Sequence, residues 1–199
     1  MPDRAVPSTA VDGRGAHRSS RWSAWLAGCG GGGSTDAGSS PTFAGSLQTK
    51  NVKLRTMRML SLLDRLNDEA GSTPTAAITY PPRAFERHPG WWPGFPWSDI
   101  AGKVDAIVPM LYTGGGFKGY DATYGYVARS LRLLRAAVGD DIVVHAAGGV
   151  ANRMSKEELR AFDDAVLDDG TATGWSLYDF QTTTPVGWAA MARLGQSLG

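Results

Sequence analysis

Residues 104–112 read VDAIVPMLY, and this nearly continuous apolar run predicts the strongest strand in the chain. A strand without polar alternation is typical of a parallel sheet that is covered on both faces. Three further runs of strand character lie at 75–80 (TAAITY), 141–147 (DIVVHAA) and 174–180 (GWSLYDF). The chain is therefore expected to contain four parallel strands.

Amphipathic helical patterns separate these strands, with apolar residues at spacings of three and four. From the first helix to the fourth, the stripes are Leu60, Leu63 and Leu66; Val127, Leu131, Leu134 and Val138; Leu159, Phe162 and Val166; Trp188 and Met191. Ser155 and Glu158 have the spacing of a capping box, and Pro185 suits the first position of the last helix. Gly148-Gly149 is expected to end the third strand, and residues 81–97 (PPRAFERHPGWWPGFPW) are expected to form a loop.

Strand followed by helix, four times over, predicts right-handed crossovers between parallel strands. Two architectures fit this order. One is a small open, doubly wound α/β sheet. The other is part of a (β/α)₈ barrel of the TIM type, which normally needs eight such units and about 250 residues.

Residues 1–44 are rich in Gly, Ser, Pro and Arg without periodicity, so they are expected to be a disordered leader or tether ahead of a folded domain at 45–199. Within the leader, LAGC at 26–29 followed by a Gly/Ser run resembles a bacterial lipoprotein processing site. The apolar run before it is short for a signal peptide. Export to the cell envelope or the medium is one expectation, and a cytoplasmic location is the alternative.

The totals exclude several classes of function. A formal net charge of +1 gives no electrostatic reason to expect nucleic acid as a partner, and no apolar run approaches the length of a transmembrane segment. A single cysteine, Cys29, and three scattered histidines do not support a metal site. The glycine run at 114–116 lacks the spacing of nucleotide-binding loops, so no cofactor is expected.

In either architecture, function gathers at the carboxyl ends of the strands. The residues at these ends are Tyr80, Met110, Tyr112, His145, Tyr178 and Asp179. They are the candidates for chemistry and for ligand binding.

The segment in which Trp97-Ser98-Asp99-Ile100 precedes VDAIVPMLY resembles a signature of secreted bacterial glycosyl-hydrolase-like (β/α) barrels, which are distantly related to family-18 chitinases. The run GWSLYD at 174–179 is similar to the last barrel strand of such proteins. The resemblance covers residues 50–198 and implies the C-terminal half of a barrel. It also implies that Met110 and Tyr112 line a cleft that binds sugars.

The sequence departs from this family in two places. The Asp-x-x-Asp-x-Asp-x-Glu run that carries the general acid of family-18 enzymes is not present. Thr113 stands where the chitinases have an aspartate after the Met-x-Tyr tyrosine. The chain is therefore expected to be a fragment or a truncated product, and its catalytic competence is in doubt.

Glycoside hydrolysis usually needs two carboxylates. Asp179 is the catalytic candidate, with a turn-capping role as its alternative, and Glu86 is a weaker second carboxylate with the alternative of a solvated loop charge. His145 is either a core histidine or a functional one. Trp91 and Trp92 would form a stacking platform for pyranose rings, or a loop packed on its own aromatics.

Three functional hypotheses remain open at this point. The first is a glycoside-hydrolase-like protein that acts on a polysaccharide, with Tyr80, Tyr112, His145 and Tyr178 holding the sugar. The second is a carbohydrate-binding barrel remnant without catalysis, and the third is an open α/β domain unrelated to sugars. Half a barrel would leave two unpaired strand edges, so self-association is expected.

Overall fold

The computed structural model describes residues 50–113, 116–178, 181 and 183–198, all within the unit Ala44–Gly199. The expected leader at 1–44 lies outside the described residues. The elements in chain order are α2 (Val52–Ala70), β1 (Ala76–Thr79), α3 (Pro82–Arg87), α4 (Trp97–Ala101), β2 (Ala106–Leu111), α5 (Gly119–Val138), β3 (Val143–Val150), the 3₁₀ helix η1 (Ala151–Arg153), α6 (Lys156–Asp169), β4 (Gly174–Tyr178) and α7 (Pro185–Leu198).

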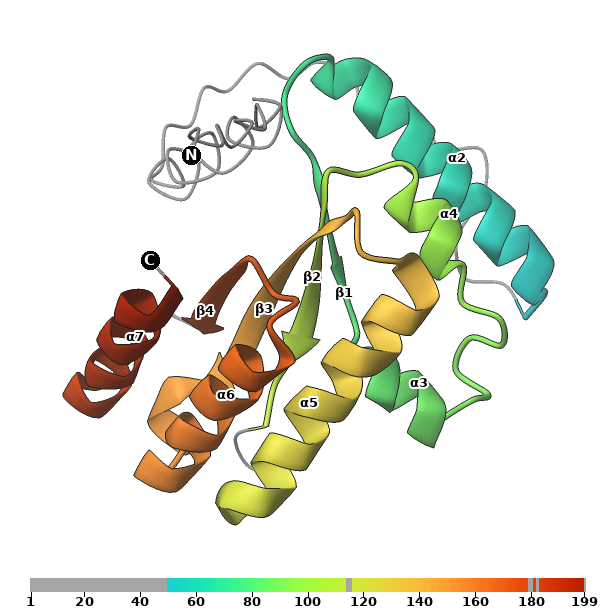
Figure 1. The fold of residues 1–199 in the computed structure, drawn as a ribbon. Coiled ribbons are helices and arrows are strands. Elements are labelled where there is room, and N and C mark those ends of the chain that lie inside the picture. Colours follow the sequence, from blue (N-terminus) through green and yellow to red (C-terminus); the bar gives the residue numbers. More distant parts are fainter. Residues whose placement is uncertain (1–49, 114–115, 179–180, 182, 199) are drawn as a thin grey trace, which may run out of the picture. The chain divides into compact units, whose positions relative to one another are not determined.

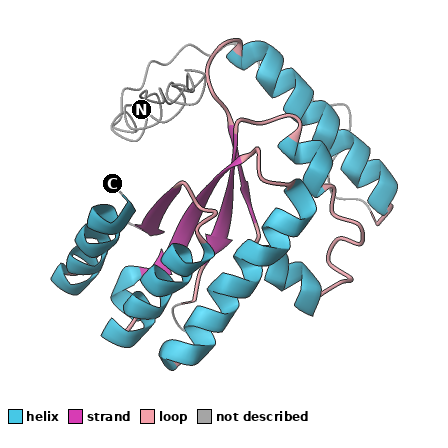
Figure 2. Ribbon diagram, viewed as in Figure 1, coloured by secondary structure: helices cyan, strands magenta, loops and turns pink. Residues whose placement is uncertain are grey.

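The four strands form one parallel sheet in the order β1-β2-β3-β4, as the sequence predicts. Because this order never reverses and parallel crossovers are right-handed, the connecting helices lie on the same face of the sheet (Figures 1 and 2). A doubly wound sheet would need a reversal of strand order, so that alternative is wrong for the described residues. The arrangement is that of half of a TIM-type (β/α) barrel wall.

The core lies between the sheet and the helices α5 and α6. On β2, Ile107 and Leu111 point into it and are fully buried, and they pack in the same cluster as Leu134 of α5 and Phe162 of α6. Pro109 lies on the same side and is buried, whereas Val108 and Met110 point to the other face and are half-buried. The continuous apolar run of β2 predicts a strand that is covered on both faces of the sheet. Among the described residues, helices pack on one face alone.

The glycine pair Gly148-Gly149 does not end the third strand, which continues through it to Val150. A Cβ atom on Gly148 would lie 2.6 Å from Leu177 Cδ2 and 2.9 Å from Phe162 Cζ. The absence of a side chain at Gly148 thus lets β3 lie close to β4 and α6. Residues that sequence reasoning interpreted as a strand break instead serve close packing.

The predicted capping box of α6 is present. The Ser155 hydroxyl accepts a hydrogen bond from the Glu158 amide, and a Glu158 carboxylate oxygen accepts one from the Ser155 amide. The other carboxylate oxygen of Glu158 accepts a hydrogen bond from Gly119 N, at the first residue of α5. One buried glutamate therefore connects the amino ends of the two core helices.

The aromatic segment after β1 is not loop throughout, because residues 82–87 form the short helix α3. Pro82 occupies its first turn, where a missing N–H costs nothing. Six residues are too few for a helical period to be visible in the sequence. Gly71 and Gly170 follow α2 and α6 with positive φ angles, as expected of glycines that end helices.

Helix α7 is attached to α6 by an ion pair. Arg193 donates to Asp163 Oδ2 at 2.6 and 3.1 Å, and also to Asp164 at 3.3 Å. The Asp163 side chain is almost completely buried, and this burial raises the pKa of its carboxyl from 3.8 to about 6 against the opposing effect of Arg193. Desolvation therefore outweighs the attraction of the guanidinium at this site.

Gly148→Ala is expected to lower the free energy of unfolding by about 1–3 kcal/mol, because the new methyl overpacks the contact with Leu177 and Phe162. Gly125→Ala is the matched control. A Cβ at Gly125 meets open space on α5, so alanine there is expected to stabilise the protein by about 0.5–1 kcal/mol. Urea unfolding measures both. Equal effects of the two variants would show that the close approach at Gly148 has no energetic weight.

Asp163→Asn is expected to change how stability depends on pH. The raised pKa of Asp163 means that between about pH 4 and 6 the folded chain binds a proton that the unfolded chain does not. The contribution of Asp163 is then fully present below about pH 4 and is lost as pH rises through 6. The difference in unfolding free energy, wild type minus variant, should fall by about 1–3 kcal/mol across this window. Urea titrations at several pH values measure it, and a constant difference would contradict the raised pKa.

Candidate functional site

Two tyrosines meet on the helix-free face of the sheet at its carboxyl edge. Tyr112 follows β2 and Tyr178 ends β4, and their ring centroids lie 5.9 Å apart. The two tyrosines belong to strands that are not neighbours, with β3 between them. Met110 pairs with Ala147 on one side of β3, and on the other side Tyr178 pairs with Val150 after a register shift between Gly148 and Val150. Burial and the neighbouring Tyr178 raise the pKa of the Tyr112 phenol.

A second aromatic group lies beside β1. The Tyr80 ring meets the Trp91 ring edge-on, with their centroids 5.9 Å apart. The His88 imidazole stacks on Trp91 with nearly parallel planes and a centroid separation of 4.4 Å. Tyr80 and Trp91 are both exposed. Helix α3 and the turn that follows it thus place the flat rings of His88 and Trp91 next to the end of β1.

Tyr80, His88 and Trp91 line a cavity of about 460 Å³ together with Tyr112, at the carboxyl ends of β1 and β2. Phe117 and Tyr126 form one of its walls, with ring centroids 4.1 Å apart, and the Arg87 guanidinium lies 5.6 Å from the centre of the Phe117 ring. The full lining is Tyr80, Pro81, Ala84, Arg87, His88, Trp91, Met110, Tyr112, Phe117 and Tyr126. A cavity with this lining offers flat apolar faces together with phenol hydroxyls.

The two tryptophans expected to form one platform are separated by the fold. Trp91 lines the cavity at the carboxyl edge. Trp92 turns toward α2, where its indole nitrogen donates to Thr56 Oγ1 at 2.9 Å and the Arg55 guanidinium lies 4.1 Å over its ring. Trp92 also meets Phe95 edge-on at 5.2 Å. One tryptophan therefore faces the candidate site and the other helps to hold the loop on α2.

His145 lies on the same helix-free face, but deeper than the sequence suggests, because β3 extends five residues beyond it. Its Nε2 atom is 3.0 Å from Ser176 Oγ on β4, and Gly174 leaves room for the ring. Burial lowers the pKa of His145, so its neutral form is favoured. The imidazole and the hydroxyl form a polar pair below the tyrosines.

Asp179 and Glu86 are the carboxylates named from the sequence, and Asp105, which precedes β2, is a third carboxylate near the sheet. Asp179 lies outside the described residues. Glu86 accepts hydrogen bonds from Arg83 and from Arg129, the latter at 2.5 Å, and these bonds lower its pKa from 4.5 to about 2. Asp105 accepts a hydrogen bond from the Thr75 amide at 2.8 Å, at the amino end of the sheet. Glu86 is therefore a charge held by two arginines, and not by its neighbour Arg87, while Asp105 has a structural partner.

Sequence reasoning missed several residues of the site. Phe117, Tyr126 and Arg87 line the cavity, and Ser176 is the partner of His145. Tyr126 directly precedes the buried Val127 on α5, so the apolar periodicity of this helix does not mark it as a residue of the site. The position of Ser176 opposite β3 would follow from strand register, which a single sequence does not reveal.

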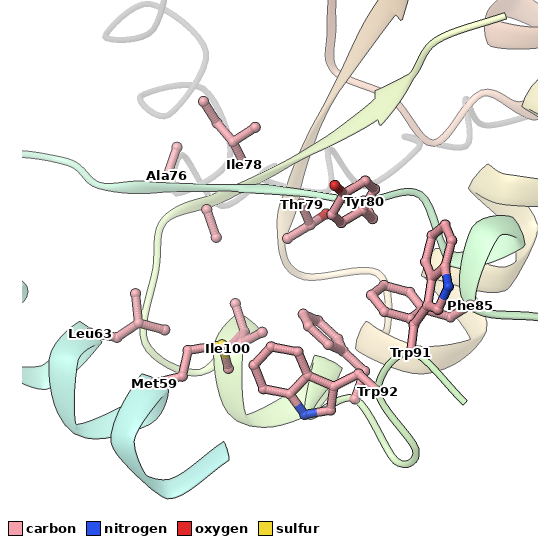
Figure 3. Close-up of a pocket in the computed structure, with 12 residues that line it drawn as sticks. Met59, Leu63, Ala76, Ile78, Thr79, Tyr80, Phe85, Trp91, Trp92 and Ile100 are labelled. Atoms are coloured by element: carbon pink, nitrogen blue, oxygen red, sulfur yellow. The ribbon is translucent and has the colours of Figure 1, made fainter. Parts of the chain in front are cut away.

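A larger cavity, of about 600 Å³, runs along β1 toward α2 and shares Tyr80 and Trp91 with the candidate site (Figure 3). Its lining includes Met59 and Leu63 of α2, Ile100 of α4 and the aromatic residues Phe85 and Trp92. These side chains are apolar and offer no group for acid–base chemistry. We therefore place the candidate site at the carboxyl edge and treat this cavity as a packing feature.

Within residues 50–113, 116–178 and 183–198, no group of three His, Cys, Asp or Glu side chains is arranged to hold a metal ion. None of the helices in the described part of the chain combines the length and the apolar character that a membrane span requires.

No protein-family model matches the chain, and no curated protein matches it either. Among solved structures, the chain is similar to the crystal structure of the spore cortex-lytic enzyme SleL of Bacillus megaterium QM B1551, with a TM-score of 0.52 and 11% sequence identity. The match covers 75% of this chain and 46% of the other, so the chain spans about half the length of the structure it resembles. At this identity the likeness is one of fold.

Proposed function

We propose that this chain is a glycoside-hydrolase-like protein that binds a polysaccharide at the carboxyl edge of its sheet. The observation that carries the proposal is the aromatic cavity formed by Trp91, Tyr80 and Tyr112, with Tyr178 beside it. Apolar walls with a few well-placed polar groups are the usual composition of a small-molecule site. Sugar rings present C–H faces that pack on aromatic rings, and hydroxyls that bond to phenols and imidazoles.

Two further observations support a sugar as the ligand. The chain shares its fold with part of a spore cortex-lytic enzyme. The run VDAIVPMLY ends at Met110 and Tyr112 of the cavity, and it is this run that resembles the barrels distantly related to family-18 chitinases. We propose that the chain is related to these barrels.

Hydrolysis would require two carboxylates on either side of the scissile bond. Asp179 follows β4 directly in the sequence and is our candidate for one of them. Glu86 is unsuited to be the general acid, because two arginines lower its pKa to about 2 and keep it ionised. The second carboxylate of a hydrolase would have to come from elsewhere.

A second candidate function is carbohydrate binding without hydrolysis. The engagement of Glu86 by Arg83 and Arg129 favours it, since the side chains described at the cavity are aromatic, aliphatic or basic. The aromatic faces would retain affinity for a sugar in the absence of an acid.

We further propose that the chain acts outside the cytoplasm. The LAGC run at 26–29 would be the processing site, and residues 1–44 would supply the leader and tether of a domain at 45–199.

Trp91→Ala and Trp92→Ala form a matched pair that tests sugar binding. Trp91→Ala is expected to raise the dissociation constant by about tenfold or more, because it removes an exposed aromatic face from the cavity. Trp92→Ala is expected to lower stability and to leave the dissociation constant of the folded protein almost unchanged. Isothermal titration with chito-, cello- and xylo-oligosaccharides measures the affinity, and urea unfolding measures the stability. Absence of binding with every oligosaccharide would overturn both carbohydrate proposals.

Asp179→Asn separates hydrolysis from binding. If the chain is a hydrolase, this change is expected to reduce release of reducing ends by about a hundredfold or more while oligosaccharide affinity is retained. Glu86→Gln is the control, expected to leave turnover unchanged. Full activity of Asp179→Asn would remove this residue from the mechanism, and affinity without turnover in the wild type would select the binding function.

A further inference from the structure

A further cavity adjoins the aromatic cavity of the candidate site. It has a volume of about 510 Å³ and is lined by α3, by α5 and by Phe117, which lies just ahead of α5. These two helices lie side by side (Figure 1). Arg87, Phe117 and Tyr126 line both cavities, so the two meet at these three side chains. A ligand that extends beyond the aromatic cavity can therefore reach the side chains of the second one.

The second cavity is basic in character. Its lining holds three arginines, Arg83, Arg87 and Arg129, against two carboxylates, Glu86 and Asp121. The Glu86 carboxylate accepts hydrogen bonds from both Arg83 and Arg129. Two of the three arginines are therefore held by one internal carboxylate.

The Arg87 guanidinium stands outside this arrangement. Among the described residues it has no hydrogen-bond or ion-pair partner, and it lies over the Phe117 ring. An aromatic face supports a guanidinium and leaves the N–H groups at its rim available. Burial raises the pKa of the Tyr126 phenol, and the positive charges of Arg87 and Arg83 act against that rise. The field of both arginines thus reaches the wall that the two cavities share.

The aromatic cavity offers no acidic side chain that would compete for Arg87. Its lining contains the basic residues Arg87 and His88 and no Asp or Glu. Asp121, on the first turn of α5, lines the second cavity and not the first. A negative charge placed in the aromatic cavity would therefore meet a guanidinium, with no carboxylate among the side chains around it.

We propose that the glycan recognised at this site is an acidic one, and that a carboxylate on one of its sugars binds the Arg87 guanidinium where the two cavities meet. The inference rests on the proposed function and names the class of polysaccharide. A guanidinium presents two parallel N–H groups that match the two oxygens of a planar carboxylate. The same sugar, or its neighbour in the chain, would stack on Trp91.

The charge would supply the specificity that stacking lacks. Every pyranose has C–H faces that pack on an aromatic ring, so Trp91 and Tyr80 alone distinguish poorly between glycans. A cation at the end of the cavity distinguishes an acidic sugar from a neutral one of the same shape. Arg87 is thus a specificity residue of the candidate site.

Isothermal titration of the full chain with matched oligosaccharides tests the proposal. Cello- and chito-oligosaccharides are compared with the same chains oxidised to carboxylates at C6, and xylo-oligosaccharides with the same chains bearing glucuronate side groups. At low ionic strength the acidic member of a pair is expected to bind about three- to tenfold more tightly, the lower value applying to a solvent-exposed ion pair. This advantage should largely disappear in about 1 M NaCl, where the Debye length falls to about 3 Å.

Variants of Arg87 assign the preference to one side chain. Arg87→Gln is expected to bring the ratio of the two dissociation constants to about one, and Arg87→Lys should keep part of the preference, because it retains the charge without the paired N–H groups. Arg87 is exposed, so neither change removes core packing. Arg132→Gln is the matched control, since it removes the same charge from an exposed position on α5 that lines neither cavity. It should keep the full ratio.

The outcomes separate this inference from the function on which it rests. Equal affinity for both members of every pair would overturn the acidic glycan and leave sugar binding in place. No binding of any oligosaccharide would overturn the proposed function, and this inference with it. A preference that survives Arg87→Gln, or that Arg132→Gln abolishes, would remove Arg87 from the recognition. Tighter binding of cello-oligosaccharides sulfated at C6 than of the carboxylates would overturn the carboxylate as the group recognised.

Discussion

The unbroken order of the four strands is the constraint on which the rest of the structure depends. Each strand pairs with the next in sequence, and a parallel crossover is right-handed, so α5 and α6 must lie on the same face. That face acquires a close-packed core around Leu134 and Phe162. The opposite face receives no helix among the described residues. A single reversal of strand order would have covered both faces and produced a different protein.

The candidate site is a consequence of the same asymmetry. Side chains alternate along a strand, so the residues between the buried positions of β2 must point to the helix-free face. Met110 and Tyr112 do so, and Tyr178 does so on β4. On the core side of β3, Gly148 admits Phe162 and Leu177. On the helix-free face, Tyr112 and Tyr178 approach each other where the register between β3 and β4 shifts.

Local patterns predicted the features whose causes are local. The order of elements, the capping box at Ser155 and the start of α7 at Pro185 follow from periodicity and helix-end chemistry. Features that depend on distant contacts were missed. Trp91 and Trp92 are adjacent and identical, and what separates their roles is Thr56 and Arg55, on a helix far earlier in the chain. A single sequence carries no sign of such contacts.

The charges around the cleft indicate what kind of ligand it suits. Glu86 serves to bind Arg83 and Arg129, and this role keeps it ionised, whereas a general acid must hold a proton near its working pH. One carboxylate cannot meet both demands. Burial raises the pKa of the Tyr112 phenol further above its usual value, which favours the neutral form. The cavity lining combines aromatic and aliphatic side chains and phenol hydroxyls with one guanidinium, that of Arg87, and it contains no carboxylate. The proposed sugar would therefore be held by stacking and hydrogen bonding, and the acid chemistry of hydrolysis would need groups beyond those that line the cavity.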